Sequence, residues 1–295
     1  MTPSPTQCSI VSRSETPRMH RPAGHLAGLL PNHEAGAMIQ PYVEPPAHGL
    51  HHGVSNASEL AVDNLSVRFQ GLAALSAVSL TTERHEVFGL IGPNGAGKTT
   101  LVNCLTGFQR PTEGRVMLGR ADTAGWPAAR FREQGVARTF QAGRLFKDMT
   151  VTENVEVTAT GLGLGMRAAR EHARALLDWI GLSEKALWRA GALAYTDQRR
   201  LGIARALVLS PAFILLDEPA AGMSDAECED LMVLVASIPK TFTCGVLLIE
   251  HNMRVVMGIS QRIHVLDGGR TIAEGTPAEI QRHEAVLAAY LGMDA

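Results

Sequence analysis

The sequence lacks the features that would place it inside a bilayer or on a nucleic acid. Its 27 Lys and Arg residues are offset by 29 Asp and Glu residues, so the formal net charge of -2 provides no basic field for nucleic-acid binding. It also has no run of about 18 consecutive apolar residues, the length that predicts a membrane-spanning helix. We therefore expect no bound nucleic acid and no membrane span.

Cysteines are few, and the features of a secreted chain are missing. Cys8, Cys104, Cys228 and Cys244 lie far apart, without the spacing of a metal site or a disulfide framework. The N-terminus lacks a basic segment followed by an apolar run and a cleavage site, so we expect no secretory signal. A reduced, cytoplasmic setting fits this composition.

Residues 1–57 differ from the rest of the chain. They hold eight of the 15 prolines and six of the 11 histidines, and no apolar period of a helix or strand runs through them. Such a segment cannot bury enough apolar surface to offset its ordering entropy, so we expect a disordered tail. His48, His51 and His52 could bind a metal, but they lack cysteine or carboxylate partners. This favours a solvated tail, or a translation start site that is placed too far upstream.

From residue 58 onward the pattern predicts a folded α/β domain. The apolar runs 87–91, 213–216 and 245–249 are typical of strands buried on both faces. Residues 226–238, between two of these runs, have helical spacing. This alternation predicts a mostly parallel sheet with helices packed on it.

Other segments add strands and helices to this core. Residues 60–68 and 77–81 have strand patterns, whereas residues 142–212 are mainly helical and are expected to form a helical subdomain. Within the subdomain, a helix over 201–209 is expected. Near the end, Thr276-Pro277-Ala278-Glu279 is a capping-box helix start, and we expect the helix it opens to extend to Tyr290.

The strongest motif is a P-loop after the strand 87–91. Its glycines allow the backbone N–H groups to surround phosphates, and the following helix adds the positive end of its dipole. Lys98 would reach the β- and γ-phosphates of ATP, and the Thr99 hydroxyl would ligate Mg²⁺. The nucleotide-binding residues predicted here are Gly92, Pro93, Asn94, Gly95, Ala96, Gly97, Lys98, Thr99 and Thr100.

Charged residues follow the next two buried runs. Asp217 and Glu218 end the run that starts at Phe213, and the carboxyl ends of parallel strands face the crevice in which phosphates bind. We expect Asp217 to hold Mg²⁺ and Glu218 to polarise the attacking water. His251 ends the next run; a lone histidine there is more often structural, but beside these two motifs a γ-phosphate contact is favoured.

With these motifs, the chain from residue 58 resembles the ATP-binding subunits of ABC transporters. The resemblance implies a P-loop NTPase fold with an antiparallel β subdomain and a helical subdomain. It implies that Gln141 senses Mg²⁺ and contacts membrane subunits, and that Phe69 stacks on adenine, although Phe69 could equally be a core residue. Residues 193–200 resemble the family's signature, and residues 221–224 stand at its D-loop.

Within that family, the chain is most similar to the G-type ATP-binding subunits of Liv branched-chain amino acid importers. Importers of urea and short amides have similar subunits. The resemblance implies a second ABC ATPase subunit in a hetero- or homodimer, transmembrane permeases, indirectly a solute-binding protein, and a peripheral location on the cytoplasmic face of the inner membrane. It rests on segments 66–72, 103–108, 138–141, 218–223 and 289–292.

The signature segment departs from the family pattern. Thr196 stands where a glycine lets the backbone approach the γ-phosphate of the partner's ATP, so its branched side chain predicts strain. Either its hydroxyl donates to phosphate, or Asp197 shifts the start of the helix. Gly202 within the helix is expected to loosen it, and Ser224 replaces the usual acid or amide of the D-loop.

These departures predict an asymmetric ATPase. The chain's own P-loop, Glu218 and His251 are retained, but the signature that would close the partner's ATP is altered, so we hypothesise one competent and one weakened site. The alternative is a regulatory module that binds ATP and hydrolyses it poorly. Soluble ABC proteins that act on ribosomes or DNA are disfavoured, because the chain has neither a second such domain nor a long coiled-coil insertion.

Overall fold

The computed structural model describes residue 42 and residues 57–139 and 145–291. The chain divides into two units, Met1–Gly36 and Ala37–Ala295, and all described residues belong to the second. The predicted disordered tail therefore lies almost wholly outside the described residues, and its boundary at residue 57 stays a prediction. Gln141 also lies outside them.

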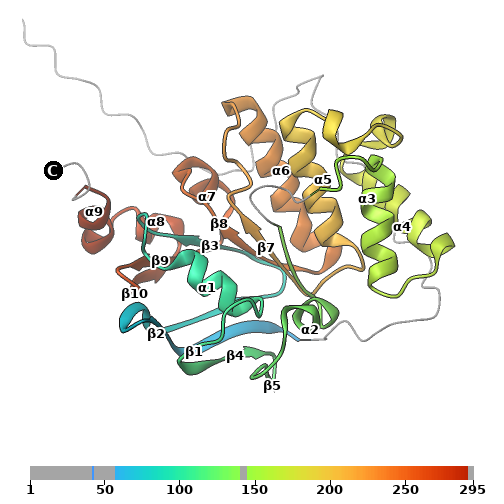
Figure 1. The fold of residues 1–295 in the computed structure, drawn as a ribbon. Helices are drawn as coiled ribbons and strands as arrows, with labels where there is room; N and C mark the ends of the chain where they lie inside the picture. The colour runs from blue at the N-terminus through green and yellow to red at the C-terminus, as the bar shows by residue number, and fades with distance from the viewer. Residues whose placement is uncertain (1–41, 43–56, 140–144, 292–295) are drawn as a thin grey trace, which may run out of the picture. The chain divides into compact units, whose positions relative to one another are not determined.

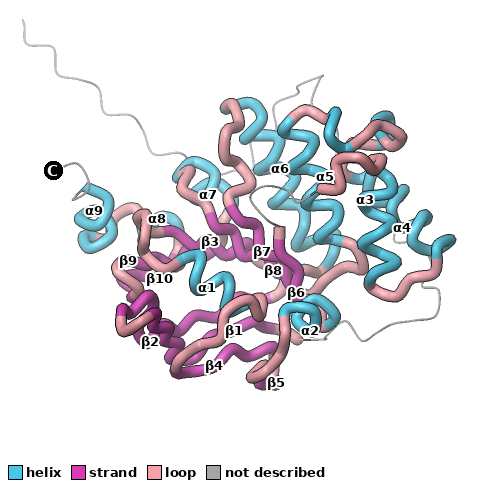
Figure 2. The backbone as a smooth tube through the Cα atoms, in the orientation of Figure 1, coloured by secondary structure: helices cyan, strands magenta, loops and turns pink. Residues whose placement is uncertain are grey.

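Two β-sheets form the framework. Within the described residues, the larger sheet has six strands in the order β10-β9-β3-β8-β7-β6, and only β10 is antiparallel to its neighbour. The smaller sheet there has four antiparallel strands in the order β2-β1-β4-β5. Both are drawn in magenta in Figure 2. The strands are β1 (Glu59–Phe69), β2 (Leu72–Glu83), β3 (Val87–Ile91), β4 (Glu113–Leu118), β5 (Ala121–Asp122), β6 (Val136–Arg138), β7 (Phe213–Asp217), β8 (Gly245–Ile249), β9 (Arg262–Asp267) and β10 (Arg270–Gly275).

The larger sheet is buried on both faces, which explains its continuous apolar strands. In β7, Phe213 and Leu215 face a core shared with α1 and the smaller sheet. Ile214 and Leu216 face the opposite core, shared with helices α3 to α7. This arrangement confirms the predicted α/β fold with a mostly parallel sheet and an antiparallel β part.

The helices flank the larger sheet in Figure 1, with α3, α4 and α5 grouped at one end and α8 and α9 at the other. Across the described ranges, none is both long and apolar enough to cross a bilayer. The helices are α1 (Lys98–Leu105), α2 (Ala128–Glu133), α3 (Val151–Gly161), α4 (Met166–Trp179), α5 (Tyr195–Leu207), α6 (Asp225–Phe242), α7 (Met253–Ile259), α8 (Pro277–Ile280) and α9 (Glu284–Leu291), with short 3₁₀ turns at Ser183–Lys185 and Ala190–Ala192.

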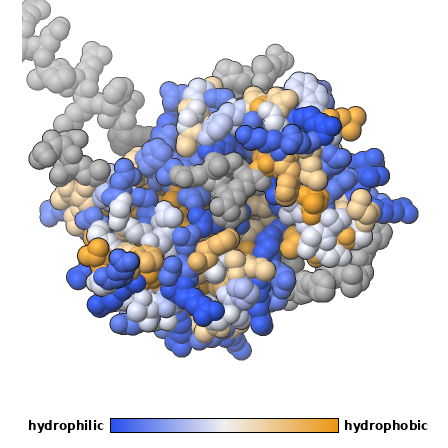
Figure 3. Space-filling view, viewed as in Figure 1, coloured by the Kyte–Doolittle hydropathy of each residue, from blue (hydrophilic) through white to orange (hydrophobic). Residues whose placement is uncertain are grey.

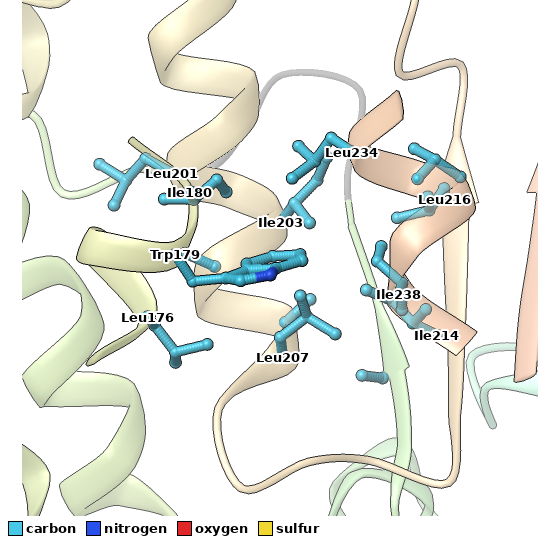
Figure 4. Close-up of a cluster of buried hydrophobic side chains, with 14 of the residues drawn as sticks. Leu176, Trp179, Ile180, Leu201, Ile203, Leu207, Ile214, Leu216, Leu234 and Ile238 are labelled. Carbon is cyan, nitrogen blue, oxygen red and sulfur yellow. The ribbon is translucent and has the colours of Figure 1, made fainter. Parts of the chain in front are cut away.

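Trp179 joins the helical part to the sheet. Its side chain, only 1% exposed, lies at the end of α4, and Figure 4 shows it between Ile203 and Leu207 of α5; Ile238 of α6 and Ile214 of β7 belong to the same buried cluster. The indole packs edge-on against Phe242, with ring centroids 4.8 Å apart. Tyr42 packs against the same Phe242, with ring centroids 4.6 Å apart. One continuous core therefore holds α4, α5, α6 and β7 together.

The predicted signature helix over 201–209 is wrong at both ends. Helix α5 begins at Tyr195. The sequence does not reveal this start, because the first turn is polar and the N-cap, Ala194, has no side chain that could form a cap hydrogen bond. It ends at Leu207, and the chain then turns away through Leu209, which has a φ of 63°.

The prediction of one helix extending to Tyr290 is also wrong. The capping box of Thr276 and Glu279 is present, but α8 ends after one turn at Ile280, and α9 starts anew at Glu284. The break allows both Ile280 and Val286 to be buried in the same cluster against β9. The hairpin of β9 and β10, which precedes these helices, gave no sequence signal that we recognised.

Replacing Trp179 by alanine should cost about 3–5 kcal/mol of unfolding free energy, because it leaves a cavity where four elements meet. Urea denaturation followed by circular dichroism would measure the loss. Trp188→Ala is the matched control: Trp188 is 52% exposed, and its loss should change stability by no more than about 0.5 kcal/mol. Equal losses for the two variants would contradict the assigned role of Trp179.

Candidate functional site

The loop between β3 and α1 depends on two glycines. Gly92 has a φ of 150° and Gly97 a φ of 102°, values that residues with a Cβ rarely adopt. A Cβ on Gly92 would lie 2.1 Å from the carbonyl oxygen of Leu266, and one on Gly97 would lie 2.7 Å from that of Ala74. Only glycine fits at these positions, so the loop backbone lies directly against its neighbours.

The start of α1 is open to an anionic ligand. Its N-cap, Gly97, makes no side-chain cap bond, and its first turn carries no acidic residue. Neither the N-cap nor an acid of the first turn therefore accepts the first backbone N–H groups of the helix, which carry the positive end of the helix dipole. Thr99 is exposed and Thr100 half-buried in this turn. The geometry fits the binding of phosphate groups.

Lys98 lies folded over this loop. Its Nζ donates hydrogen bonds to the carbonyl oxygens of Gly92, at 2.6 Å, and Pro93, at 2.9 Å. Burial lowers the pKa of the Lys98 ammonium, and the carboxylates of Glu218 and Asp217 act against that shift. The structure thus brings together the ammonium of α1 and the two acids at the end of β7, which sequence reasoning had placed in one site.

Asp217 is held by an arginine to which sequence reasoning gave no role. An amino group of Arg138, at the end of β6, lies 2.7 Å from Oδ2 of Asp217, and the two side chains are only 8% and 12% exposed. The other amino group of Arg138 donates to Oδ1 of Asn103 in α1. Thr139 Oγ1 accepts the backbone N–H of Asp217 at 3.3 Å. Arg138 therefore fixes the orientation of the Asp217 carboxylate.

Glu218 and His251 meet at the ends of β7 and β8. Glu218 has a φ of 48°, a left-handed value uncommon for a residue with a Cβ, and its N–H donates to the carbonyl oxygen of Ile249. His251 Nδ1 lies 3.9 Å from Oε1 of Glu218. Backbone strain of this kind concentrates at functional sites, where neighbouring structure maintains it.

Glu250 organises the backbone around this pair. It is 1% exposed. Its Oε1 accepts the N–H of Ala220 at 2.6 Å, and its Oε2 accepts those of His251 at 3.1 Å and Asn252 at 3.3 Å. Sequence reasoning gave Glu250 no role. Its carboxylate ties the turn after β7 to the turn after β8, so the two turns keep one relative geometry.

The donor set fits Mg²⁺ held together with a nucleotide. Among the described residues no group of three or more His, Cys, Asp or Glu side chains could hold a metal by itself. Mg²⁺ is commonly bound by one or two protein oxygens together with substrate phosphates, and the hydroxyl of Thr99 and the carboxylate of Asp217 are ligands of that kind. Gln141, the third predicted ligand, lies outside the described residues.

Phe69 is not a core residue. It ends β1 and its side chain is 47% exposed. This exposure rules out the alternative of a core phenylalanine and leaves an aromatic face near the surface. Stacking of adenine on this face stays a prediction.

Comparison with known proteins places these features in one family. Residues 75–221 match the profile of the ABC transporter family, and residues 270–293 match that of the branched-chain amino acid ATP-binding cassette transporters. The high-affinity branched-chain amino acid transport ATP-binding protein LivG of Salmonella typhimurium is 47% identical over 79% of this chain and 97% of that protein. BraF of Pseudomonas aeruginosa, of the same description, is 44% identical over 79% of this chain and 97% of its own length.

A solved structure is similar as well. The ADP conformation of an ATP-binding cassette of an ABC transporter has 30% identity and a TM-score of 0.72, over 79% of this chain and 98% of that chain.

The contact of Arg138 with Asp217 predicts a loss of metal affinity in Arg138→Met. Removing the arginine leaves a buried carboxylate without its cation and free to turn, and losses of about 10–100-fold are usual when a group behind a metal ligand is removed. Mn²⁺ titrated against the protein with ATP, followed by electron paramagnetic resonance, would measure the change. Arg115→Met is the control, because its pair with Asp63 is exposed. Unchanged Mn²⁺ affinity in Arg138→Met would refute this role.

Proposed function

The chain belongs to the family of ABC transporter ATP-binding subunits, and from that premise we propose that it hydrolyses ATP to drive the import of branched-chain or related amino acids. Support for the substrate class comes from the relatives named for branched-chain amino acid transport and from the profile matched by residues 270–293. The observation that carries the ATPase proposal is the meeting of Lys98, Asp217, Glu218 and His251 at one edge of the larger sheet.

Each of these residues has a distinct task in the proposed reaction. The N–H groups of the loop and of α1, with Lys98, bind the phosphates and neutralise charge that develops in the transition state. Glu218 orients the attacking water and accepts its proton, and His251 contacts the γ-phosphate. Thr99 and Asp217 would hold Mg²⁺, which would supply further neutralisation of the phosphate charge.

The proposal includes protein partners. We place a second ABC ATPase subunit against this chain, in a hetero- or homodimer, with transmembrane permeases and, through them, a solute-binding protein. The chain would then lie on the cytoplasmic face of the inner membrane as a peripheral subunit. The support is the description of its relatives as transport ATP-binding proteins.

A groove on the described surface suits a cytoplasmic segment of a permease. It has a volume of about 560 Å³ and lies between the C-cap of α1 and α2, β6, α3 and α5, with Phe108 and Phe146 in its lining. Both rings are about half exposed, and the guanidinium of Arg205 covers Phe146. In Figure 3 the rim of the viewed face is mostly blue, whereas orange and tan side chains gather nearer its middle, in the region of α3 and α5. We propose that the permease docks here.

Two alternative functions are each favoured by a specific observation. A regulatory module with weak hydrolysis is favoured by Thr196 in the signature segment, and opposed by the geometry of Glu218 and His251. Import of urea or short amides rests on the similarity of those importers' ATPase subunits.

Replacing Glu218 by glutamine should lower ATP turnover by at least about 100-fold while ATP binding is retained, because the amide cannot accept the proton of water. The measurement uses the chain assembled with its second ATPase subunit, permeases and binding protein in vesicles. Radiolabelled leucine should enter the wild-type vesicles and not those with Glu218→Gln. Glu113→Gln, an exposed glutamate of β4, is the control.

Turnover that persists in Glu218→Gln would place hydrolysis at another site. ATP binding without turnover in the wild type would favour the regulatory module. Uptake of urea without leucine would favour the other substrate class.

The groove predicts opposite effects of one substitution on stability and assembly. Gly202 lines the groove from α5, and a Cβ added there would meet no atom within 4 Å. Gly202→Leu should stabilise the isolated chain by about 0.5–1 kcal/mol, because glycine weakens a helix interior, yet it should reduce co-purification with the permeases by filling the groove. Gly202→Ala is the control: it should give the same gain in stability and leave co-purification with the permeases intact. Normal assembly with Gly202→Leu would contradict docking at this site.

A further inference from the structure

The unusual threonine of the signature segment has a partner within its own chain. Thr196 lies in the first turn of α5, after the N-cap Ala194, which makes no side-chain cap bond. The Thr196 hydroxyl donates a hydrogen bond to Oε1 of Glu227, in the first turn of α6. The hydroxyl is thus committed to a carboxylate of the same chain.

Glu227 is at the same time bound to the D-loop. Its Oε2 accepts the backbone N–H of Ser224 at 2.8 Å and the Ser224 hydroxyl at 2.7 Å, as part of the capping box that starts α6. The hydrogen bond from Thr196, followed by those from Ser224, lowers the pKa of Glu227 to about 2. One fully charged carboxylate therefore joins the first turn of α5 to the first turn of α6.

Two neighbouring residues pack in agreement with this link. Asp197, which is 9% exposed, forms an ion pair with Lys185. The negative charge of Asp197 is therefore paired within the helical part of the same chain. Gly222 of the D-loop has a φ of 76°, and a Cβ there would lie 3.7 Å from the ring of Tyr195, so the first residue of α5 also lies over the D-loop.

We propose that Thr196 is a positioning residue that, through Glu227, locks the signature segment 193–200 to the D-loop 221–224 as one rigid surface, which closes over the ATP held by the second ATPase subunit. This rests on the proposed function, and it replaces the expectation of a weakened second site with that of a braced one. Because the Thr196 hydroxyl is occupied by Glu227, contact with that ATP would come from the backbone of α5. The serine of the D-loop belongs to the same device, because its hydroxyl and N–H occupy the other oxygen of Glu227.

The test compares Thr196→Val with Thr196→Ser in the assembled transporter. Valine has the shape of threonine without the hydroxyl, whereas serine retains it. The loss of a hydrogen bond to a charged group changes a rate or equilibrium constant by about 10-fold or more. Thr196→Val should therefore lower kcat for ATP hydrolysis by roughly 10-fold, with KM for ATP little changed. Thr196→Ser should restore most of kcat. Thr160→Val is the control, because the Thr160 hydroxyl bonds within its own helix α3.

A double-mutant cycle separates action through Glu227 from direct contact with phosphate. If Thr196 acts through Glu227, Glu227→Gln lowers kcat as Thr196→Val does, and combining the two adds little. Additive effects would mean that the threonine works by another route, such as a direct phosphate contact, and would overturn the proposal. Unchanged kcat in Thr196→Val would overturn it as well.

Loss of global folding is excluded by melting temperature and by ATP binding at this chain's own P-loop, which should match the wild type. Failure of the proposed function gives a different result: a wild-type complex without ATP turnover, or turnover insensitive to Glu218→Gln. An active complex that is sensitive to Glu218→Gln but indifferent to Thr196→Val would reject only the bracing role.

Discussion

The site depends on the close packing of the loop between β3 and α1 against β2 and the turn that joins β9 to β10. A Cβ on Gly92 would lie 2.1 Å from the carbonyl oxygen of Leu266, and one on Gly269 would lie 2.6 Å from that of Ala74. Gly269 also donates its N–H to Ala96 and accepts that of Ser76. Three segments that are distant in the sequence thus meet with their backbones in close contact. The loop cannot shift unless the sheet edge shifts with it, and this fixes the position of Lys98 and of the start of α1.

The acids at this edge are distinguished by their partners rather than by their type. Asp217 is paired with the buried guanidinium of Arg138, and Glu250 accepts three backbone N–H groups. Both carboxylates are therefore held in one orientation by groups that are themselves fixed. The Glu218 side chain is 30% exposed, and its carboxylate lies 3.9 Å from a histidine that is more exposed still. Of the three, Glu218 has the access to solvent that activation of a water molecule requires.

Features that depend on neighbouring residues could be predicted from the sequence. The P-loop, the strand before it and the buried strands β7 and β8 each have a local pattern, and the structure places all of them as expected. Contacts between distant segments had no such pattern. Arg138 and Asp217 are 79 residues apart and meet only because β6 pairs with β7, and Thr196 meets Glu227 across 31 residues because α5 and α6 start side by side. The start of α5 could not be predicted for a different reason: the alanine at its N-cap carries no capping signal.

Helix α5 connects two proposed contact surfaces. At about 1.5 Å per residue, its 13 residues from Tyr195 to Leu207 span roughly 20 Å. The half that carries Gly202 and Arg205 lines the groove, and the other end carries Thr196 and its link to α6. A permease docked at the proposed groove would therefore contact the same helix that carries Thr196 at its other end. Gly202 lies near the middle of this helix, so the residue that leaves the groove open is also the one that weakens the helix between its two ends.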